Sequence, residues 1–385
     1  MLSVLLTLYR FKKQAADIGK SSFALAWVMD TGSEERERGV TVDIAQHHFS
    51  TDKTDFTILD APGHRDFVPN MIGGASMANL TVLVVDANQL ESGMKGQTKE
   101  HIQLAQAVGL EKIVVAVNKL DTTNPPWNQD TFQTVKTEVS KFLTEIGFPE
   151  SDVTFVPCSG LGGENVANPA SVDWVKQNHQ TLLQHLEQSP ARQPTEALLK
   201  RPFRLQITDV FRGGVQNPLS VSGLITAGSA QVGDVFTVQP GGEMATIKGI
   251  EVAADGRDWA VAGEICNLHL ADIEAQHLRS GDMLCSSSQP VAVVKSFTTK
   301  VQAIDALLPQ SLDVHIGRLH VPGSIAQLVA TVGWNGEVLK KKPRVVKAGS
   351  MAVIKVALEE GAPVEDGDRV VLRAGGSTVA AGVVE

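Results

Sequence analysis

The segment KIVVAVNKLD, Lys112–Asp121, decides the fold class of the chain. Lys112–Val117 is a short apolar run rich in β-branched residues, and the polar turn Asn118–Asp121 follows it directly. Such a run is typical of a strand that is buried on both faces of a parallel sheet. Ligands of open parallel sheets bind outside the carboxyl ends of the strands. The segment therefore predicts an α/β domain with a binding site at the turn.

Three further apolar runs lie on either side of this segment, at Asp55–Asp60, Thr81–Asp86 and Thr154–Pro157. Helix-like stretches lie between them, at Thr98–Ala107 and Thr131–Glu145. Alternation of this kind predicts a doubly wound α/β domain, with all four runs as buried strands of one parallel sheet.

A proline-rich stretch then separates two parts of different character. Residues 188–202 contain Pro190, Pro194 and Pro202, which favour a linker. Beyond it, short alternating strands are broken by glycine turns and almost no helical period remains, which predicts two β-barrels. We therefore expect the α/β domain over residues 1–195 and all-β barrel domains over 196–290 and 291–385.

Composition limits the kinds of partner. The 385 residues include 34 Lys and Arg against 43 Asp and Glu, for a net charge of −9. A bulk electrostatic grip on nucleic acid is therefore not expected, and any RNA contact must use local basic patches. Three cysteines without metal-ligand spacing fit a reducing cytosol. No stretch is long enough to cross a bilayer, so we expect a cytoplasmic protein without a membrane partner.

The turn Asn118-Lys119-Leu120-Asp121 has the chemistry of a guanine site. The Asp121 carboxylate would accept hydrogen bonds from guanine N1–H and the N2 amino group and would reject adenine. Sites that use buried hydrogen bonds in this way favour the correct ligand over an analogue that lacks the matching group by a factor of roughly 10⁴ or more. The Lys119 stem would cover the base. The alternative is a solvated turn between a strand and a loop.

A second turn, after Thr154–Pro157, supports the same assignment. Backbone N–H groups of Ser159, Gly160 and Leu161 would bind the guanine oxygen. This string is the least specific of the set and means little alone.

Two other strings suggest phosphate and metal chemistry. Asp60, after its strand, would hold Mg²⁺ through water, since Mg²⁺ gives up its waters reluctantly. Gly63 would let a backbone N–H approach a terminal phosphate, and His64 would orient the attacking water. The Thr41 hydroxyl would bind Mg²⁺ and the γ-phosphate in a segment that hydrolysis releases. The alternatives are an ordinary turn at Asp60 and a solvated charged face at Glu34–Thr41.

The sequence lacks one part that such a site needs. A triphosphate site of this type uses G-x-x-x-x-G-K-[ST] between a strand and a helix. Gly19-Lys20-Ser21-Ser22 resembles its end, but position 14 is glutamine and the preceding residues are helix-like. Nothing else in the chain supplies the loop. We therefore expect residues 1–385 to bind GTP poorly and suspect a truncated N-terminus.

Longer runs carry a family resemblance. Ile18–Ala45, Asp60–Ile72 (DAPGHRDFVPNMI), Gly96–His101 (GQTKEH) and Asn118–Asp121 resemble translational GTPases of the elongation factor one-alpha class. The resemblance covers essentially the whole chain. Within the class, Asp258–Gly263 (DWAVAG) and the GGST and AAG strings near the C-terminus look most like the ribosome-rescue GTPase that partners Pelota.

The resemblance implies a role for each site residue. Thr41 and Asp60 would bind Mg²⁺ and His64 would position the hydrolytic water. Asn118, Lys119 and Asp121 would bind the guanine of GTP or GDP.

It also implies partners. The barrels would dock a Pelota-type, release-factor-like protein on the ribosome, with no sequence-specific DNA binding. The missing first strand and phosphate-binding loop depart from the family pattern. Alternatives are an elongation or release factor, a non-hydrolysing ribosome- or partner-binding scaffold, and the GTPase subunit of a sulfate-activating enzyme.

Overall fold

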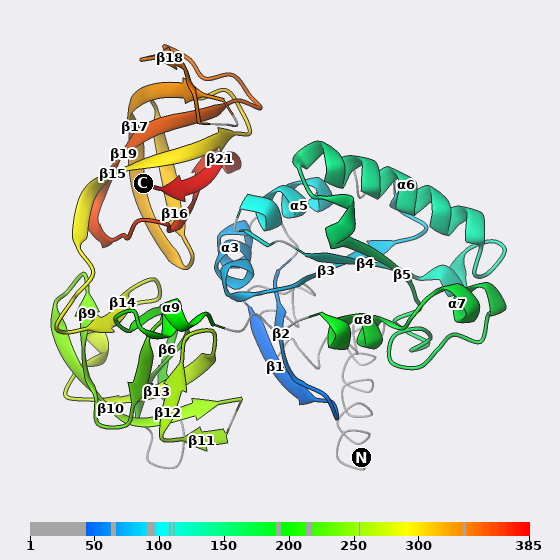
Figure 1. Ribbon diagram of the computed structural model, residues 1–385, viewed down its shortest axis with the longest axis horizontal. Coiled ribbons are helices and arrows are strands. Elements are labelled where there is room, and N and C mark those ends of the chain that lie inside the picture. The colour runs from blue at the N-terminus through cyan, green and yellow to red at the C-terminus, as the bar shows by residue number, and fades with distance from the viewer. Residues whose placement is uncertain are drawn as a thin grey trace, which may run out of the picture.

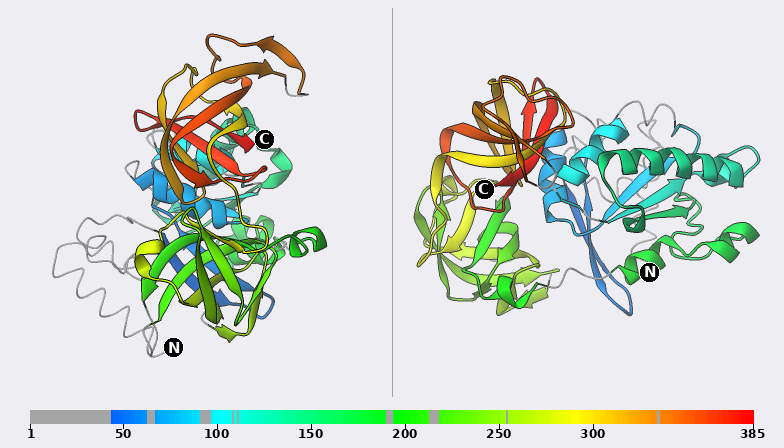
Figure 2. Two further views of the ribbon diagram at one scale, coloured as in Figure 1. Left: turned by 90° about the vertical axis from the view of Figure 1, so that its left-hand side faces the viewer. Right: turned by 45° about the horizontal axis from the view of Figure 1, so that its top comes forward.

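The computed structural model describes residues 44–62, 67–90, 97–107, 109–110, 112–189, 194–212, 218–253, 255–333 and 336–385. They form an α/β domain and two β-barrels, and the barrels stack along one side of the α/β domain (Figures 1 and 2). The predicted fold class is confirmed. Within the described residues, no helix is both long and apolar enough to cross a membrane.

The α/β domain is built on a short parallel sheet in which β4 lies between β3 and β5. Helices α5 and α6 cover one face of this sheet (Figure 1), where Ile102 and Phe132 join the core formed by Val115 and Val117. The described elements are β1 (Ala45–Ser50), β2 (Asp55–Asp60), α3 (Val68–Met77), β3 (Thr81–Asp86), α5 (Gln97–Ala107), β4 (Ile113–Asn118), η4 (Leu120–Thr122), α6 (Gln129–Ile146), η5 (Glu150–Asp152), β5 (Val153–Pro157), α7 (Asp173–Asn178) and α8 (Leu182–Gln188).

Helix α6 shows how local sequence sets the element boundaries. The Asn128 side chain accepts a hydrogen bond from the Thr131 N–H and caps the first turn. Phe132, Val135 and Val139 recur at helical spacing and are buried. Gly147, at φ 102°, ends the helix in a left-handed conformation that glycine adopts without strain.

The prediction that Asp55–Asp60 is a buried strand of the parallel sheet is wrong. This segment is β2, and it pairs antiparallel with β1 in a separate two-stranded sheet. The two strands are joined by a tight turn in which Thr51 N–H donates to Thr54 O. Local hairpin closure costs little entropy, whereas parallel pairing requires a long crossover. Phe49 and Phe56 stack across the hairpin, with ring centroids 4.9 Å apart.

Strand β3 forms one margin of the parallel sheet. Among the described strands it pairs with β4 alone. Val82 and Val84, which alternate with inward side chains, are 38% and 61% exposed. The expectation of complete burial therefore also fails for this face of β3, which no described element covers.

The two barrels are closed antiparallel sheets. Barrel II closes where β9 pairs with both β14 and β10, and barrel III closes where β16 pairs with both β20 and β17. Barrel II follows α9 (Glu196–Leu199) and contains β6 (Arg204–Arg212), β7 (Leu219–Ala227), β8 (Ser229–Gln231), β9 (Val235–Gln239), β10 (Glu243–Val252), β11 (Asp255–Arg257), β12 (Trp259–Val261), β13 (Ile265–Ala271), η6 (Ala275–His277) and β14 (Met283–Ser286). Barrel III contains β15 (Val293–Ala303), β16 (Ser311–Ile316), β17 (Leu319–Val332), β18 (Val338–Lys341), β19 (Met351–Pro363), β20 (Arg369–Ala374) and β21 (Ser377–Val384).

Specific contacts fasten the barrels to each other. The buried Arg204 guanidinium of barrel II forms a two-pronged ion pair with Glu365 of barrel III, at 3.0 Å. The Gln206 side chain donates to Ile316 O at 2.7 Å. A planar guanidinium that meets a carboxylate in this way fixes orientation as well as distance.

The α/β domain is fastened to barrel III by an apolar seam and by one arginine. Val68, Met71 and Ile72 of α3 pack with Val371 and Ala381 of barrel III. Beside this seam, Arg318 donates from Nε to Thr208 O of barrel II and from a terminal nitrogen to Asn70 Oδ1 of α3. One side chain therefore contacts all three bodies.

Candidate nucleotide-binding site

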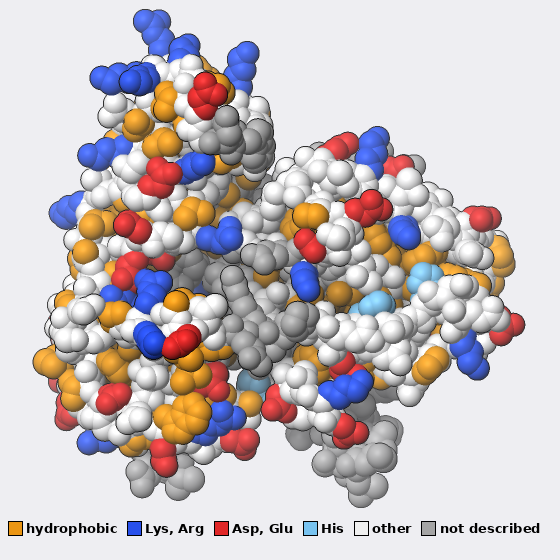
Figure 3. Space-filling model, in the orientation of Figure 1, with side chains coloured by type: hydrophobic (Ala, Val, Ile, Leu, Met, Phe, Trp, Pro, Cys, Tyr) orange, Lys and Arg blue, Asp and Glu red, His pale blue; other side chains and the backbone are white. Residues whose placement is uncertain are grey.

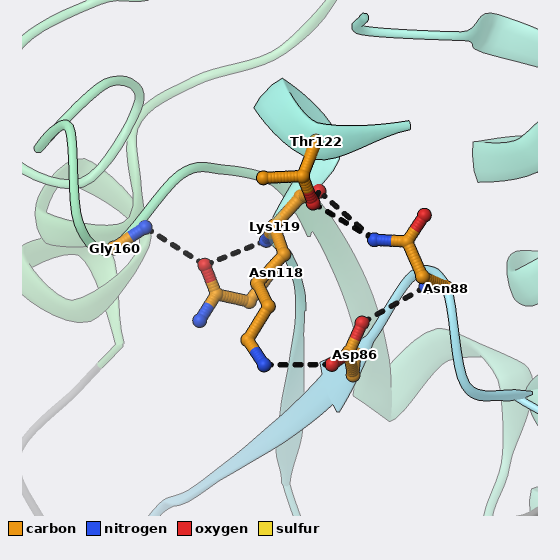
Figure 4. A network of polar contacts seen from close by, with 6 residues as sticks. All are labelled: Asp86, Asn88, Asn118, Lys119, Thr122 and Gly160. Carbon is orange, nitrogen blue, oxygen red and sulfur yellow. Dashed lines mark hydrogen bonds and ion pairs between the residues drawn. The ribbon is translucent and has the colours of Figure 1, made fainter. Parts of the chain in front are cut away.

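Asn118, the last residue of β4, joins two loops at the carboxyl edge of the parallel sheet. Its side-chain Oδ1 accepts hydrogen bonds from the N–H of Lys119 at 2.8 Å and from the N–H of Gly160 at 2.7 Å (Figure 4). A Cβ on Gly160 would lie 3.3 Å from the Asn118 amide, so glycine permits this close approach. The structure thus brings together two strings that are 42 residues apart in sequence.

Lys119 lies in an unusual backbone conformation. Its φ is 64°, in the left-handed region that non-glycine residues rarely adopt. The turn directs its side chain across β4 to β3, where Nζ lies 2.8 Å from Asp86 Oδ2 (Figure 4). Local strain of this kind gathers at functional sites, because the surrounding contacts must hold the residue in place.

Asp86 is a site residue that sequence reasoning missed. Burial of its carboxyl raises its pKa, but hydrogen bonds from Lys119 and from the Asn88 N–H outweigh burial and hold the pKa below its usual value. The carboxylate is therefore charged at neutral pH. An ion pair with a half-exposed lysine contributes at most about 1 kcal/mol to stability, so Asp86 serves mainly to orient Lys119. Its position at the end of a predicted strand was the available signal.

Asn88 completes the network from the loop after β3. Its side-chain nitrogen donates to Thr122 Oγ1 at 2.9 Å and to Lys119 O at 3.4 Å. Thr122 Oγ1 in turn donates to Lys119 O. The β3 and β4 loops are therefore cross-linked on one side, while Asn118 links β4 to the β5 loop on the other (Figure 4).

The three predicted residues of the loop after β5 differ in burial and in the use of their backbone N–H groups. Ser159 is buried, and its N–H is used in a hydrogen bond to Glu164 O. Leu161 is 82% exposed. Of the three residues predicted here, Gly160 is the one whose N–H is hydrogen-bonded to the Asn118 side chain.

Asp121 lies in the 3₁₀ turn η4 and is half-buried. Its negative charge acts on Cys158: burial raises the pKa of that thiol to about 11, and Asp121 adds to the shift. The carboxylate is thus close to the β4–β5 loops. The predicted guanine residues therefore converge on one edge of the sheet.

The predicted phosphate and metal residues are described only in part. Asp60 is the last residue of β2, opposite Ala45 in the hairpin, and its carboxylate is the hard oxygen ligand that Mg²⁺ prefers. Thr41, Gly63, His64 and Gly19–Ser22 lie outside the described residues. No group of three His, Cys, Asp or Glu residues in the described part of the chain could hold a metal ion.

Two cavities of the α/β domain lie away from this site. One, of about 180 Å³, is lined by Lys112 and Ile113 at the amino end of β4, and one, of about 480 Å³, by Val153 and Thr154 at the amino end of β5. None of the predicted site residues lines either cavity. The candidate site therefore lies outside both cavities, at the carboxyl ends of the strands.

Comparison with known families matches both ends of the chain. Residues 4–201 match the elongation factor Tu GTP binding domain, and residues 310–385 match the elongation factor Tu C-terminal domain.

Among curated proteins, the chain is 39% identical over 393 residues to the elongation factor 1 alpha-like protein of Schizosaccharomyces pombe, covering 98% of this chain and 64% of that protein. It is 37% identical over 388 residues to elongation factor 1-alpha of Picrophilus torridus, covering 97% and 88%. It is 33% identical over 396 residues to Protein HBS1 of Drosophila melanogaster, covering 98% and 58%. The chain thus spans less than two thirds of the first and third of these relatives.

Solved structures show the same fold at lower identity. The GTPase-like domain of Saccharomyces cerevisiae Ski7 has a TM-score of 0.76 at 17% identity, covering 98% of this chain and 90% of that one. Elongation factor SelB of Methanococcus maripaludis has a TM-score of 0.69 at 21% identity, covering 90% and 74%. The family match over half of the chain and the identity to curated elongation factors lead to one conclusion: this chain belongs to the translational GTPases of the elongation factor Tu and elongation factor 1-alpha family.

Proposed function

We propose that the chain is a guanine-nucleotide-dependent translation factor that hydrolyses GTP on the ribosome, in the rescue of stalled ribosomes with a Pelota-type partner. The chain belongs to a family of GTP hydrolases. The observation that carries the proposal is the Asn118 bridge, which holds the Lys119 turn and the Gly160 loop together.

This arrangement suits a purine base. Asn118 and Asp86 fix the turn, and in this proposal the Lys119 stem would cover the base while the Asp121 carboxylate would accept hydrogen bonds from its edge. Guanine offers two donors, N1–H and the N2 amino group, where adenine offers one acceptor and no matching donor. Adenine would leave the carboxylate acceptor without a donor. The free energy lost when that carboxylate is removed from water would then not be recovered, so the site would reject adenine.

The Asp121→Asn variant tests base recognition. An amide presents a donor that suits the second carbonyl of xanthine, so preference should move from guanine to xanthine nucleotides. Titration with fluorescent GDP and XDP measures both affinities. Asp130→Asn, at an exposed position of α6, makes the same change of charge outside the site and should leave the preference unchanged. If Asp121→Asn still prefers GDP as the wild type does, the guanine assignment is wrong.

Hydrolysis is assigned to His64 with Mg²⁺. Thr41 and Asp60 would hold the ion, which would neutralise charge on the phosphates. His64 would orient the water. In a protein to which the phosphate-binding loop has been restored, His64→Ala should lower ribosome-stimulated hydrolysis while nucleotide affinity stays the same. Unchanged turnover in that variant would remove His64 from the catalytic role.

The rescue role is supported by the 33% identity to Protein HBS1 over 98% of the chain and by the DWAVAG run at Asp258–Gly263. Elongation is the competing role, because elongation factor 1-alpha of Picrophilus torridus is 37% identical to this chain, more than Protein HBS1. Pull-down from cell extract separates the two. A Pelota-type protein should come down with a rescue factor, whereas recovery of aminoacyl-tRNA would favour elongation.

A second candidate function is a ribosome- or partner-binding scaffold that does not hydrolyse GTP. The observation that favours it is that residues 1–385 contain no G-x-x-x-x-G-K-[ST] string. Ribosome-stimulated GTP hydrolysis separates the two candidates: a translation factor should turn GTP over and a scaffold should not. Turnover of GTP by this chain would contradict the scaffold.

A further inference from the structure

The larger of the two cavities in the α/β domain has the size of a ligand site. Its volume is about 480 Å³, and it lies between α6, the amino end of β5 and the segment that joins α7 to α8. Figure 1 shows β5 between α6 and α8, and Figure 3 shows histidine side chains at the surface of this part of the domain. Sites for small organic ligands have volumes of roughly 300 to 1,000 Å³.

The cavity is lined by basic side chains from three separate elements. Lys136 belongs to α6, His179 directly follows α7, and His185 lies on α8. None of these three side chains forms a hydrogen bond or an ion pair with another described residue. Their N–H groups are therefore available to a ligand in the cavity.

Local structure holds both imidazoles in place. The ring of His179 packs edge-on against Phe132 and Trp174, with ring centroids 5.1 and 5.7 Å away. Thr181 caps the first turn of α8, one turn before His185. Groups that are already ordered lose little conformational entropy when they bind a ligand.

The charges that surround the cavity favour an anion. Burial lowers the pKa of His179, and the nearby charges of Lys136 and His185 lower it further. Burial also lowers the pKa of His185. Three groups whose positive charges would oppose one another therefore lie close together, and an anion between them relieves that repulsion. Among the described residues that line the cavity, the exposed Glu150 supplies the one carboxylate.

The rest of the lining indicates a phosphate monoester. Ser140 and Thr154 add hydroxyl groups to the donors from α6, α7 and α8. A phosphate has three strong acceptor oxygens and can use donors on several sides, whereas a carboxylate has two oxygens in one plane. Val153 and the buried Phe155 supply apolar surface for an organic group. A bare ion would leave that surface unused.

We propose that this cavity, at the amino end of β5, binds a small phosphate monoester through Lys136, His179 and His185. None of its lining residues belongs to the proposed nucleotide site. Binding in the cavity can therefore hold or fail separately from the proposed GTPase function.

The test titrates the full chain with phenyl phosphate at pH 7 and follows the ring resonances of His179 and His185 by NMR. These resonances report on the cavity and not on the nucleotide site, and their shifts with concentration give the affinity. His179→Gln and His185→Gln assign them.

The cavity variant is Lys136→Gln, at an exposed position of α6. Its matched control is Lys141→Gln, which makes the same change of charge at an exposed position of the same helix that does not line the cavity. Circular dichroism verifies that both variants fold.

Phenyl phosphate should shift both histidine resonances. Lys136→Gln should weaken its binding by roughly tenfold or more, because a hydrogen bond between charged groups is lost, and Lys141→Gln should bind as the wild type does. Phenol should leave both resonances in place. Resonances that phenyl phosphate does not move, unchanged affinity in Lys136→Gln, or equal weakening in both lysine variants would overturn the proposal. Equally tight binding of benzoate would overturn the choice of phosphate.

Discussion

Substitution of Gly73 by alanine should loosen the α/β domain from barrel III, although it should strengthen helix α3 by itself. In a helix interior, alanine is favoured over glycine by about 1 kcal/mol. In the folded protein, however, a Cβ at position 73 would meet Arg318 Cδ at 2.1 Å and Cγ at 2.9 Å. Real Cβ atoms do not approach so closely, so the arginine must move.

The magnitude follows from the contacts that Arg318 would lose. Its hydrogen bonds to Thr208 O, at 3.3 Å, and to Asn70 Oδ1, at 3.5 Å, are two interactions of about 1 kcal/mol each. After the helix gain is subtracted, local opening of α3 should become easier by about 1 kcal/mol, which corresponds to about fivefold more protein with α3 open.

Hydrogen–deuterium exchange of the α3 amides, at residues 68–77, measures this change, and exchange should be about fivefold faster in Gly73→Ala. A double-mutant cycle sharpens the test. In an Arg318→Ala background the clash is absent, so Gly73→Ala should then slow exchange. Slower exchange of Gly73→Ala in the wild-type background would refute the reasoning, because helix propensity alone would then account for the result.

Two further predictions rest on buried titratable groups. Burial lowers the pKa of His315 to about 3, helped by the charges of His320 and Arg373 and opposed by Asp313. Its neutral form stabilises the fold above the unfolded pKa, and that stability is lost as pH falls from about 6.5 toward 3. Between pH 7 and 5 the wild type should therefore lose roughly 2 kcal/mol relative to His315→Phe in denaturant titrations. Burial also raises the pKa of Asp368 to about 6, so this group stabilises the fold as the pH falls. Because Asp368 contributes equally to the wild type and the variant, comparing the two proteins isolates the effect of His315. Parallel pH profiles would contradict the assignment. For Cys158, burial raises the pKa to about 11, so iodoacetamide at pH 8 should label it only after unfolding, as read by mass spectrometry; rapid labelling of the native protein would show that the β5 loop is open.

Strand and helix positions followed closely from the sequence, because they depend on local patterns. Thr81–Asp86 and Asp55–Asp60 have the predicted bounds, and Lys112–Val117 is shifted by one residue. Helix α6 begins two residues before the predicted Thr131, since Asn128 provides a cap that the periodic pattern does not show.

Strand pairing and side-chain partners were harder to predict, because they depend on distant residues. β2 has the composition of a buried parallel strand, but the turn at Thr51–Thr54 pairs it with β1. Asn118, Lys119 and Gly160 were predicted as a site and lie together. Asp86 was not predicted as part of the site, because it is 33 residues from Lys119 in the sequence and meets it only when β3 and β4 pair.

Strand β3, whose outer edge pairs with no described strand, has a consequence for how the protein behaves at high concentration. Val82 and Val84 flank a row of backbone donors and acceptors that no described strand satisfies. Such a row is a template on which another extended chain can add itself, and natural sheets usually protect it with lysine, proline or a bulge. The run TVLVVD has none of these, and its one charge, Asp86, is neutralised by Lys119. Among the described strands, β3 is therefore one expected site of intermolecular strand addition, and Val84→Lys is the simplest way to block it.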